Sequence, residues 1–496
     1  MTILLLLAPI LLPLAAAGLH AAAGWRPRTS AWTGVVTTGL LAVDVIALAV
    51  TVTRHGPVHT AGGLIRADAL SAWMLLGVAA VALLACWASP AYLVAGRESR
   101  RRSRWYGILL HLFIAAMATA VLAGNLGVLW VAIEATTIVT AFLVGHHRSR
   151  PALEAAWKYV VICSAAIAVA FLGLVLLYYA AKHAGLAGED ALDWATLTGH
   201  AHHLDPAVTR IAIGLAVIGF GAKAGLIPLH AWLPDAHSQA PAPVSALMSG
   251  VLLPVALYAV LRVKAIADPA LGAGYLRTLL LILALGTLAL AALLLIGQRD
   301  YKRMLAYSSM EHMGLIALAA AIGSPLAIAA LLLHMAGHGL AKTVAFLSSG
   351  HILHRHDSSQ ITDVRALATR VPLLAGLFGL AVLALLGFPP AALFASELGI
   401  ARAGAAAGMS WVTAAAFTLA LAAFAAITAH TGRMLLGPAP VTSTVAAAQA
   451  SDPPSAFTLA AAMPLIAGLL GVAALGITLG PVADLLHAAA STVVTP

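Results

Sequence analysis

The chain has 496 residues, of which 62% are hydrophobic and only 9% are charged, and its formal net charge is +9. A soluble globular domain carries roughly 25% charged residues, so this composition excludes a soluble enzyme and indicates a polytopic membrane protein. No face rich in Lys and Arg appears, which excludes nucleic acid as a partner. The two cysteines, Cys86 and Cys163, lie inside apolar runs and are too few to hold an iron–sulfur cluster, so we expect no cofactor in this chain.

Apolar stretches of helical length follow one another along the whole chain. Spanning a bilayer takes roughly 20 residues, and segments this long and uniformly apolar must satisfy their backbone groups as α-helices. The first stretch lacks the positively charged start of a signal peptide, so we interpret it as the first membrane helix. We expect an all-α polytopic membrane protein whose transmembrane helices lie at 2–20, 31–52, 69–90, 106–123, 125–145, 156–180, 208–228, 243–263, 275–296, 303–322, 325–350, 371–400, 409–435 and 457–486, fourteen in all.

The Lys and Arg residues of the connecting loops predict the orientation. With the N-terminus outside, the inner loops, which include Lys302, hold roughly twice as many of them as the outer loops, to which we assign Arg262 and Lys264. Cytoplasmic loops are generally enriched in Lys and Arg. We therefore expect both termini to lie outside.

The span at 125–145 carries Glu134, and the next span carries Lys158. An ion pair or a shared hydrated pocket would lower the cost of burying both charges in the membrane. Such a pair is either static or able to open, and only a pair that opens can move protons.

The stretch from Gly219 to Gly250 departs most from a plain membrane helix. Lys223 lies inside an apolar span, and Pro228 breaks the helix five residues later. A charge beside a helix break within the membrane is costly and by default marks a functional site. His230 and His237 flank the segment WLPDA that follows, where they either take up protons or simply pack the turn.

The span at 325–350 carries His334, His338 and Lys342 at intervals of four residues, which places all three on one helix face. Because histidine changes charge near neutral pH, such a row suits a proton relay. The alternative is a pair of structural histidines beside a lysine that closes a polar pocket. We favour the relay because three titratable groups share the stripe.

A second interrupted helix predicts an internal repeat. Gly387, Pro389 and Pro390 break the span at 371–400, and Glu397 follows the break, as Lys223 precedes the break five spans earlier. Because five is odd, the second copy is inverted, and inverted repeats with broken helices are typical of transporters. The expected organisation is N-terminal helices at 1–105, a first repeat at 106–263, a second repeat at 275–436 and a C-terminal helix at 457–496.

The buried charges form two predicted half-paths for protons. Glu134, Lys158 and Lys223 form the first, and Lys342 with Glu397 forms the second, flanked by His334, His338 and the accessory pair Glu311 and His312. The His-rich loops at 200–205 and 351–357 have no secure ligand spacing, so we expect no metal site. No motif of nucleotide binding or nucleophilic catalysis appears, so we expect no catalytic residue.

The segment KAGLIPLHAWLPDAHSQAPAPVSALMSG resembles the signature of the antiporter-like subunits of respiratory complex I and its relatives. Glu134, Lys158, the histidine stripe and Glu397 fall where that family has its charges. Residues 298–318, with the pair Glu311–His312, resemble the hydrogenase-4 component F branch of the group 4 hydrogenases. Pro254 stands where many members carry a lysine, so a water wire or the region of His334 must join the half-paths.

The resemblance implies a proton-translocating membrane subunit of a hydrogenase-4-like or complex I-like redox complex in a bacterial or archaeal plasma membrane. Its partners would be other membrane subunits, a peripheral redox arm that holds the catalytic centre, the lipid bilayer and protons. One alternative is a subunit of a multi-subunit sodium/proton antiporter. Another is a non-pumping membrane anchor, which the retained intramembrane charges disfavour, because leucine would serve an anchor equally well.

Overall fold

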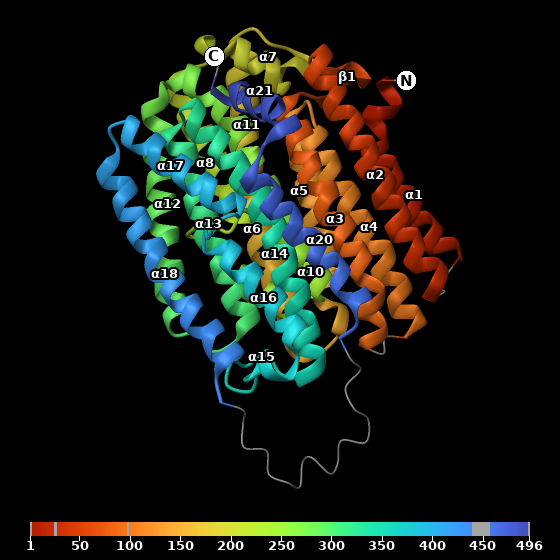
Figure 1. The fold of residues 1–496 in the computed structure, drawn as a ribbon. Helices are drawn as coiled ribbons and strands as arrows, with labels where there is room; N and C mark the ends of the chain where they lie inside the picture. The colour runs from red at the N-terminus through yellow and green to blue at the C-terminus, as the bar shows by residue number, and fades with distance from the viewer. Residues whose placement is uncertain (1, 24–26, 97–98, 439–456, 495–496) are drawn as a thin grey trace.

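The computed structural model describes residues 2–23, 27–96, 99–438 and 457–494 and forms a bundle of long helices (Figure 1). Two short strands, β1 (Val58–Thr60) and β2 (Ile65–Ala67), form an antiparallel hairpin between the second and third helices. The helices are α1 (Thr2–Ala23), α2 (Pro27–His55), α3 (Ala69–Ala95), α4 (Arg100–Leu122), α5 (Leu126–Val144), α6 (Arg150–His183), α7 (Trp194–Gly199), α8 (Pro206–Lys223), α9 (Trp232–Gln239), α10 (Ala242–Leu247), α11 (Leu253–Leu271), α12 (Ala273–Ile296), α13 (Tyr301–Ile322), α14 (Pro325–His356), α15 (Leu367–Arg370), α16 (Pro372–Leu385), α17 (Ala392–Ala406), α18 (Ser410–Leu436), α20 (Leu459–Ile477) and α21 (Ala483–Val494).

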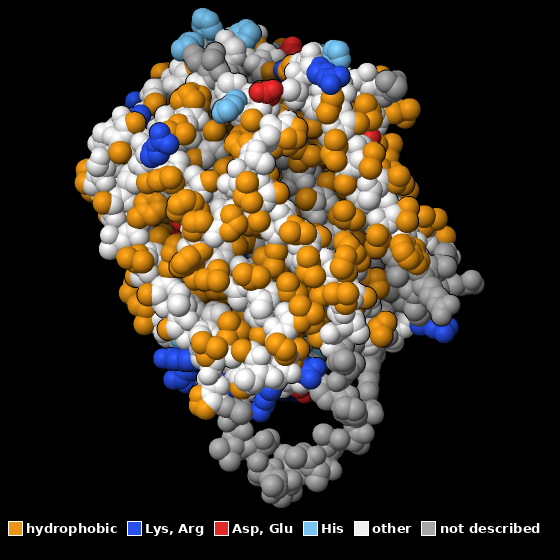
Figure 2. Space-filling view, in the orientation of Figure 1, with side chains coloured by type: hydrophobic (Ala, Val, Ile, Leu, Met, Phe, Trp, Pro, Cys, Tyr) orange, Lys and Arg blue, Asp and Glu red, His pale blue; other side chains and the backbone are white. Residues whose placement is uncertain are grey.

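The expected all-α membrane fold is confirmed. Among the described residues, thirteen helices are long and apolar enough to cross a membrane. Hydrophobic side chains cover the middle of the bundle, whereas Lys and Arg gather toward its two ends (Figure 2). This distribution matches the apolar belt and polar margins that a bilayer requires.

Both expected helix breaks are present. The helix α8 ends at Lys223, and the chain passes Pro228 before α9 begins. The helix α16 ends at Leu385, and the interruption before α17 contains Gly387, Pro389 and Pro390, so the span expected at 371–400 is two shorter helices. The chain therefore has the two interrupted helices that the repeat requires, while the repeat and its inverted relation stay predictions.

The last expected span, 457–486, is wrong at its C-terminal end. The helix α20 stops at Ile477, where Thr478 adopts an extended conformation (φ −153°), and α21 begins only at Ala483. Pro481 in the connection lacks a backbone N–H and cannot continue the ladder of α20. The apolar composition of this stretch concealed the interruption.

The centre of the molecule is built from the helices of both halves. The helix α14 packs against α13, α10, α16 and α17, as well as α3 and α20. In the α10–α11 segment and in α13, all residues of the most apolar 18-residue stretch are buried, whereas in α1 only 28% of the residues of that stretch are buried. The central helices therefore carry side chains that meet protein on every side, while α1 lies at the periphery.

Arg262 and Lys264, assigned above to an outer loop, instead lie buried in α11. The guanidinium of Arg262 donates two hydrogen bonds of 2.7 Å to the carboxylate of Asp68, the residue that caps α3, and stacks 3.9 Å from the ring of Trp194. Lys264 pairs with Asp268 one turn later. Burial raises the pKa of the Asp68 carboxyl, but Arg262 and Ser71 lower it by more, so it lies below its usual value. Arg262 lies within the expected span itself, and Lys264 is buried because α11 extends past the expected end at 263 to Leu271.

Candidate functional site

Lys223 lies at the end of α8, with its side chain fully buried among the helices of the first half. Its ammonium donates hydrogen bonds of 2.7 Å to the hydroxyl of Thr137 on α5 and of 2.7 Å to that of Tyr159 on α6. The ammonium also lies 4.6 Å from the centre of the Tyr159 ring. The sequence-predicted charge beside the break is therefore held by neutral groups only.

Glu134 and Lys158 do not form the expected pair. Glu134 accepts a hydrogen bond of 2.8 Å from Ser164, and its second carboxylate oxygen has no partner among the described residues. The Lys158 side chain is 47% exposed and contacts Glu154 and Asp235 instead. Consecutive residues of a helix point about 100° apart, so Tyr159 faces Lys223 and Lys158 turns away from it. Electrostatically, Glu134 acts on Lys223.

The stripe on α14 is buried, and two of its members, Lys342 and His334, have distinct hydrogen-bond partners. Lys342 donates hydrogen bonds to the carbonyl oxygen of Leu305 at 2.8 Å and to the hydroxyl of Ser308, both on α13. The His334 ring bonds to the His312 ring at 3.1 Å on one side. On its other side it bonds to the Ser396 hydroxyl of α17 at 2.9 Å. Hydrogen bonds thus join the stripe on α14 to α13 and α17.

Two carboxylic acids lie among these imidazoles. Glu311 is fully buried, lies 3.5 Å from the His312 ring nitrogen, and acts electrostatically on Lys342. Glu397 follows the α16–α17 break and approaches Gly387, whose φ of +66° favours glycine; a Cβ there would lie 2.4 Å from the Glu397 carboxylate. The accessory pair Glu311–His312 therefore belongs to one group with His334, His338, Lys342 and Glu397, which we call the second cluster. Within it, Lys342 does not pair with Glu397.

His338 lies inside the same cluster, with its ring centre 5.0 Å from that of His312. Neither of its ring nitrogens has a hydrogen-bond partner among the described residues. Its side chain is fully buried.

His237 lies between the second cluster and the group of Lys223, Thr137 and Tyr159, which we call the first cluster. Its ring stacks on Phe346 of α14 at 5.1 Å and faces Trp232, which in turn packs 5.1 Å from Tyr159, the partner of Lys223. The charges of Lys342 and Lys302 both act on it electrostatically. Both of its ring nitrogens are buried and, within the described part of the chain, unpartnered. His237 therefore faces the protein interior, whereas His230 is half-buried in the break itself.

Two further residues of the site were missed from the sequence. Lys302, counted among the inner loops, is buried at the start of α13 and donates hydrogen bonds to the carbonyl oxygens of Ser238 and Ala240, at 2.7 and 2.9 Å. Asp235 joins Lys158 to Arg303. The only sequence signal was the position of Asp235 in the short amphipathic piece after Pro228.

Among the described residues, one group brings together three side chains that could ligate a metal ion, namely His312, His334 and Glu397, whose ligand atoms lie within 4.8 Å of one another. The two histidines already share a hydrogen bond, and Ser396 occupies the far nitrogen of His334. The group is therefore a hydrogen-bonded one, in which these two ring nitrogens are already engaged.

Curated relatives carry names of respiratory-type membrane subunits. The chain is 41% identical to a hydrogenase-4 component F homolog of Methylacidiphilum infernorum over 305 residues, which are 61% of this chain and 63% of that protein. It is 33% identical to NADH-quinone oxidoreductase subunit N of Desulforudis audaxviator over 344 residues, which are 68% of this chain and 66% of that protein. The matched part thus spans slightly less than two thirds of these relatives.

Solved structures match the chain over nearly its full length. A chain of the Mrp complex from Dietzia sp. superimposes with a TM-score of 0.86 at 23% identity, covering 100% of this chain and 98% of that one, a likeness of fold alone. A chain of the archaeal membrane-bound sulfane sulfur reductase gives 0.84 at 25% identity, covering 99% and 97%. A chain of Thermus thermophilus respiratory complex I gives 0.73 at 26% identity, covering 97% and 98%. Residues 123–423, which carry both clusters, match the profile of the transmembrane family "NADH:quinone oxidoreductase/Mrp antiporter", and the chain belongs to this family.

Proposed function

We propose that the chain is a proton-translocating membrane subunit of a hydrogenase-4-like or complex I-like redox complex. The observation that carries the proposal is the row of buried titratable groups through both halves, with His237 between the clusters of Lys223 and Lys342. The relatives named for hydrogenase-4 and for NADH-quinone oxidoreductase support the same class of complex.

The proposed path begins at Glu134 and Lys223, passes His237 and reaches Lys342. From there it continues through the cluster of His338, His312, Glu311, His334 and Glu397. Lys223 and Lys342 are hydrogen-bonded to neutral groups only, so each ammonium lacks a fixed counter-charge at contact distance. A buried charge held in this way is sensitive to every charge nearby, so a proton gained at one group favours its release at the next.

The wider setting follows from the proposal. The complex would lie in a bacterial or archaeal plasma membrane, and both termini would lie outside. Other membrane subunits would flank this chain, and a peripheral redox arm would supply the energy. The halves 106–263 and 275–436 would act as inverted repeats, each carrying one cluster beside its broken helix.

Replacing Lys223 by methionine tests the path, because methionine keeps an apolar chain of similar length and removes the titratable group. The complex is isolated through an affinity tag on this chain and reconstituted in liposomes, and proton uptake is measured during its own redox reaction. We expect Lys223→Met to lower the protons moved per electron about tenfold or more. Lys182→Met, on the exposed end of α6, is the control and keeps the native ratio.

Native proton uptake in Lys223→Met, with electron transfer also unaffected, would overturn the proposal and favour a non-pumping anchor. Sodium/proton antiport is the second candidate, because the fold matches a chain of an Mrp complex. Repeating the measurement in sodium-free buffer separates the two functions. Uptake that persists without sodium supports proton translocation, and uptake that requires sodium supports antiport.

A further inference from the structure

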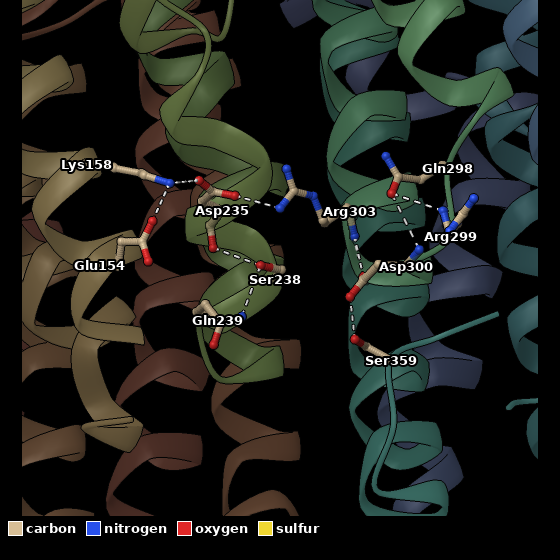
Figure 3. A network of polar contacts seen from close by, with 10 residues as sticks. All are labelled: Glu154, Lys158, Asp235, Ser238, Gln239, Gln298, Arg299, Asp300, Arg303 and Ser359. Atoms are coloured by element: carbon tan, nitrogen blue, oxygen red, sulfur yellow. Dashed lines mark hydrogen bonds and ion pairs between the residues drawn. The ribbon is translucent and has the colours of Figure 1, made fainter. Parts of the chain in front are cut away.

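Asp235 is the centre of a charge network that joins the two halves of the molecule (Figure 3). One of its carboxylate oxygens accepts a hydrogen bond of 3.1 Å from Lys158 on α6, in the first half. The other accepts one of 2.7 Å from Arg303 on α13, in the second half. Glu154 contacts the far side of Lys158 at 2.7 Å. Two carboxylates thus balance two cations, and among the ion pairs of the described residues Asp235 is the carboxylate that contacts both cations.

The short helix that carries Asp235 is fixed at its other end as well. The helix α9 has eight residues, and its last carbonyl groups have no partner within the helix. Lys302 binds the carbonyl oxygens of Ser238 and Ala240, and the hydroxyl of Ser245 donates to the carbonyl oxygen of His237 at 3.0 Å. The helix is therefore held by side chains rather than by a continuous backbone ladder.

His237 follows Asp235 by two residues, so the two side chains point about 200° apart around α9. Asp235 faces Lys158 and Arg303, while His237 faces Phe346 in the interior. Because no described hydrogen bond holds the His237 ring, the position of α9 and the stacking on Phe346 determine where its nitrogens lie. Any shift or rotation of α9 about its axis moves the carboxylate and the imidazole together.

We propose that Asp235 is a positioning residue that holds His237, through α9, at the point where protons pass between the two halves. This inference rests on the proton-translocating function proposed above. Two cations from different halves bind one carboxylate, so α9 keeps its place only while both halves keep their relative arrangement. Asp235 itself contacts neither of the two clusters and acts only through α9.

The test compares Asp235→Asn, Asp235→Glu and Glu154→Gln in the reconstituted complex. Asp235→Asn leaves Lys158 and Arg303 without their shared counter-charge, and we expect the protons moved per electron to fall about fivefold or more. Asp235→Glu keeps the charge and restores at least half of the native ratio. Glu154→Gln removes a carboxylate from the same Lys158 without touching α9, and it keeps the native ratio.

Hydrogen–deuterium exchange of residues 232–240 in the same complexes supplies a second measurement. We expect faster exchange in Asp235→Asn and native exchange in Glu154→Gln. A native proton ratio in Asp235→Asn overturns the inference, and so does equal loss in Asp235→Asn and Asp235→Glu. If Asp235→Asn does not assemble, Lys158→Met and Arg303→Gln each remove one cation, and native ratios in both would overturn it.

The same experiments separate this inference from the proposed function. A native ratio in Asp235→Asn together with a strong loss in Lys223→Met overturns the positioning role alone. A native ratio in Lys223→Met overturns the proposed function, and the positioning of His237 then has no proton transfer to serve.

Discussion

Lys223 and Lys342, the two lysines of the proposed proton path, occupy different kinds of surroundings. Lys223 lies at the end of a broken helix, and two hydroxyl groups hold it. Lys342 lies inside the continuous helix α14 and bonds to a backbone carbonyl and one hydroxyl, and Glu311 acts on it electrostatically. Three histidines and Glu397 complete that second cluster. In the first half, Lys223 thus stands among hydroxyl groups, whereas in the second half Lys342 stands near several titratable groups.

This difference predicts unequal tolerance to substitution. In the first half, each group near Lys223 has no equivalent neighbour, so its loss affects the path directly. In the second half, His312, His334 and His338 lie close enough for one ring to take over from another.

The largest effect is expected from removing both hydroxyl groups that hold Lys223. Thr137→Val with Tyr159→Phe keeps the shape of the pocket but leaves the ammonium without hydrogen bonds, each worth about 1.5–3 kcal/mol to a charged group. Protons moved per electron should fall about as far as in Lys223→Met, tenfold or more. Tyr179→Phe, on the exposed face of α6, is the control. A loss of less than threefold would show that Lys223 does not depend on these groups.

His237→Phe tests the connection between the clusters. Phenylalanine preserves the stacking on Phe346 but cannot carry a proton, so we expect uptake to fall about tenfold or more while both clusters stay intact. His183→Phe at the exposed end of α6 serves as the control. Native proton uptake in His237→Phe would mean that water joins the two halves without this imidazole.

The sequence predicted the helices, both breaks and the stripe on α14, because apolar periodicity, proline and spacing of four residues are local signals. It did not predict which of two adjacent residues faces inward. Lys158 and Tyr159 differ by one position, as do Lys302 and Arg303, and in each pair one side chain turns to the interior and the other to Asp235. That choice depends on tertiary packing, which the sequence of one chain does not reveal.

The position of His237 between the two halves was not predicted from the sequence, for the same reason. Pro254 indicated that no lysine joins the two half-paths at that position, and the sequence did offer His237 as a candidate for proton uptake. Its place between Trp232 and Phe346, however, depends on how α9 packs against α14 after the break. The charge pair of Asp68 and Arg262 likewise joins residues 194 positions apart, far beyond any local pattern.

Gly387→Ala probes the geometry of the second cluster. A Cβ at this position would lie 2.4 Å from the Glu397 carboxylate, and the φ of +66° adds backbone strain, so Glu397 must move away from its present place. We expect a fall of about fivefold in protons moved per electron, smaller than for the first half because the histidines remain. Gly376→Ala, where a Cβ meets nothing within 4 Å, is the control. A loss as large as that of Lys223→Met would contradict the redundancy of the second cluster.

The smallest effect is expected from Ser308→Ala beside Lys342. The substitution removes one hydrogen bond, but the carbonyl oxygen of Leu305 still accepts from the ammonium, and Glu311 remains near it. Protons moved per electron should fall less than about threefold. The matched variant is the single substitution Thr137→Val, in which Tyr159 is intact. Each of the two variants then removes one hydroxyl group, Ser308→Ala beside Lys342 and Thr137→Val beside Lys223. Equal losses at the two sites would remove the distinction between the halves, because they would mean that Lys342 depends on its hydrogen bonds as strictly as Lys223 does.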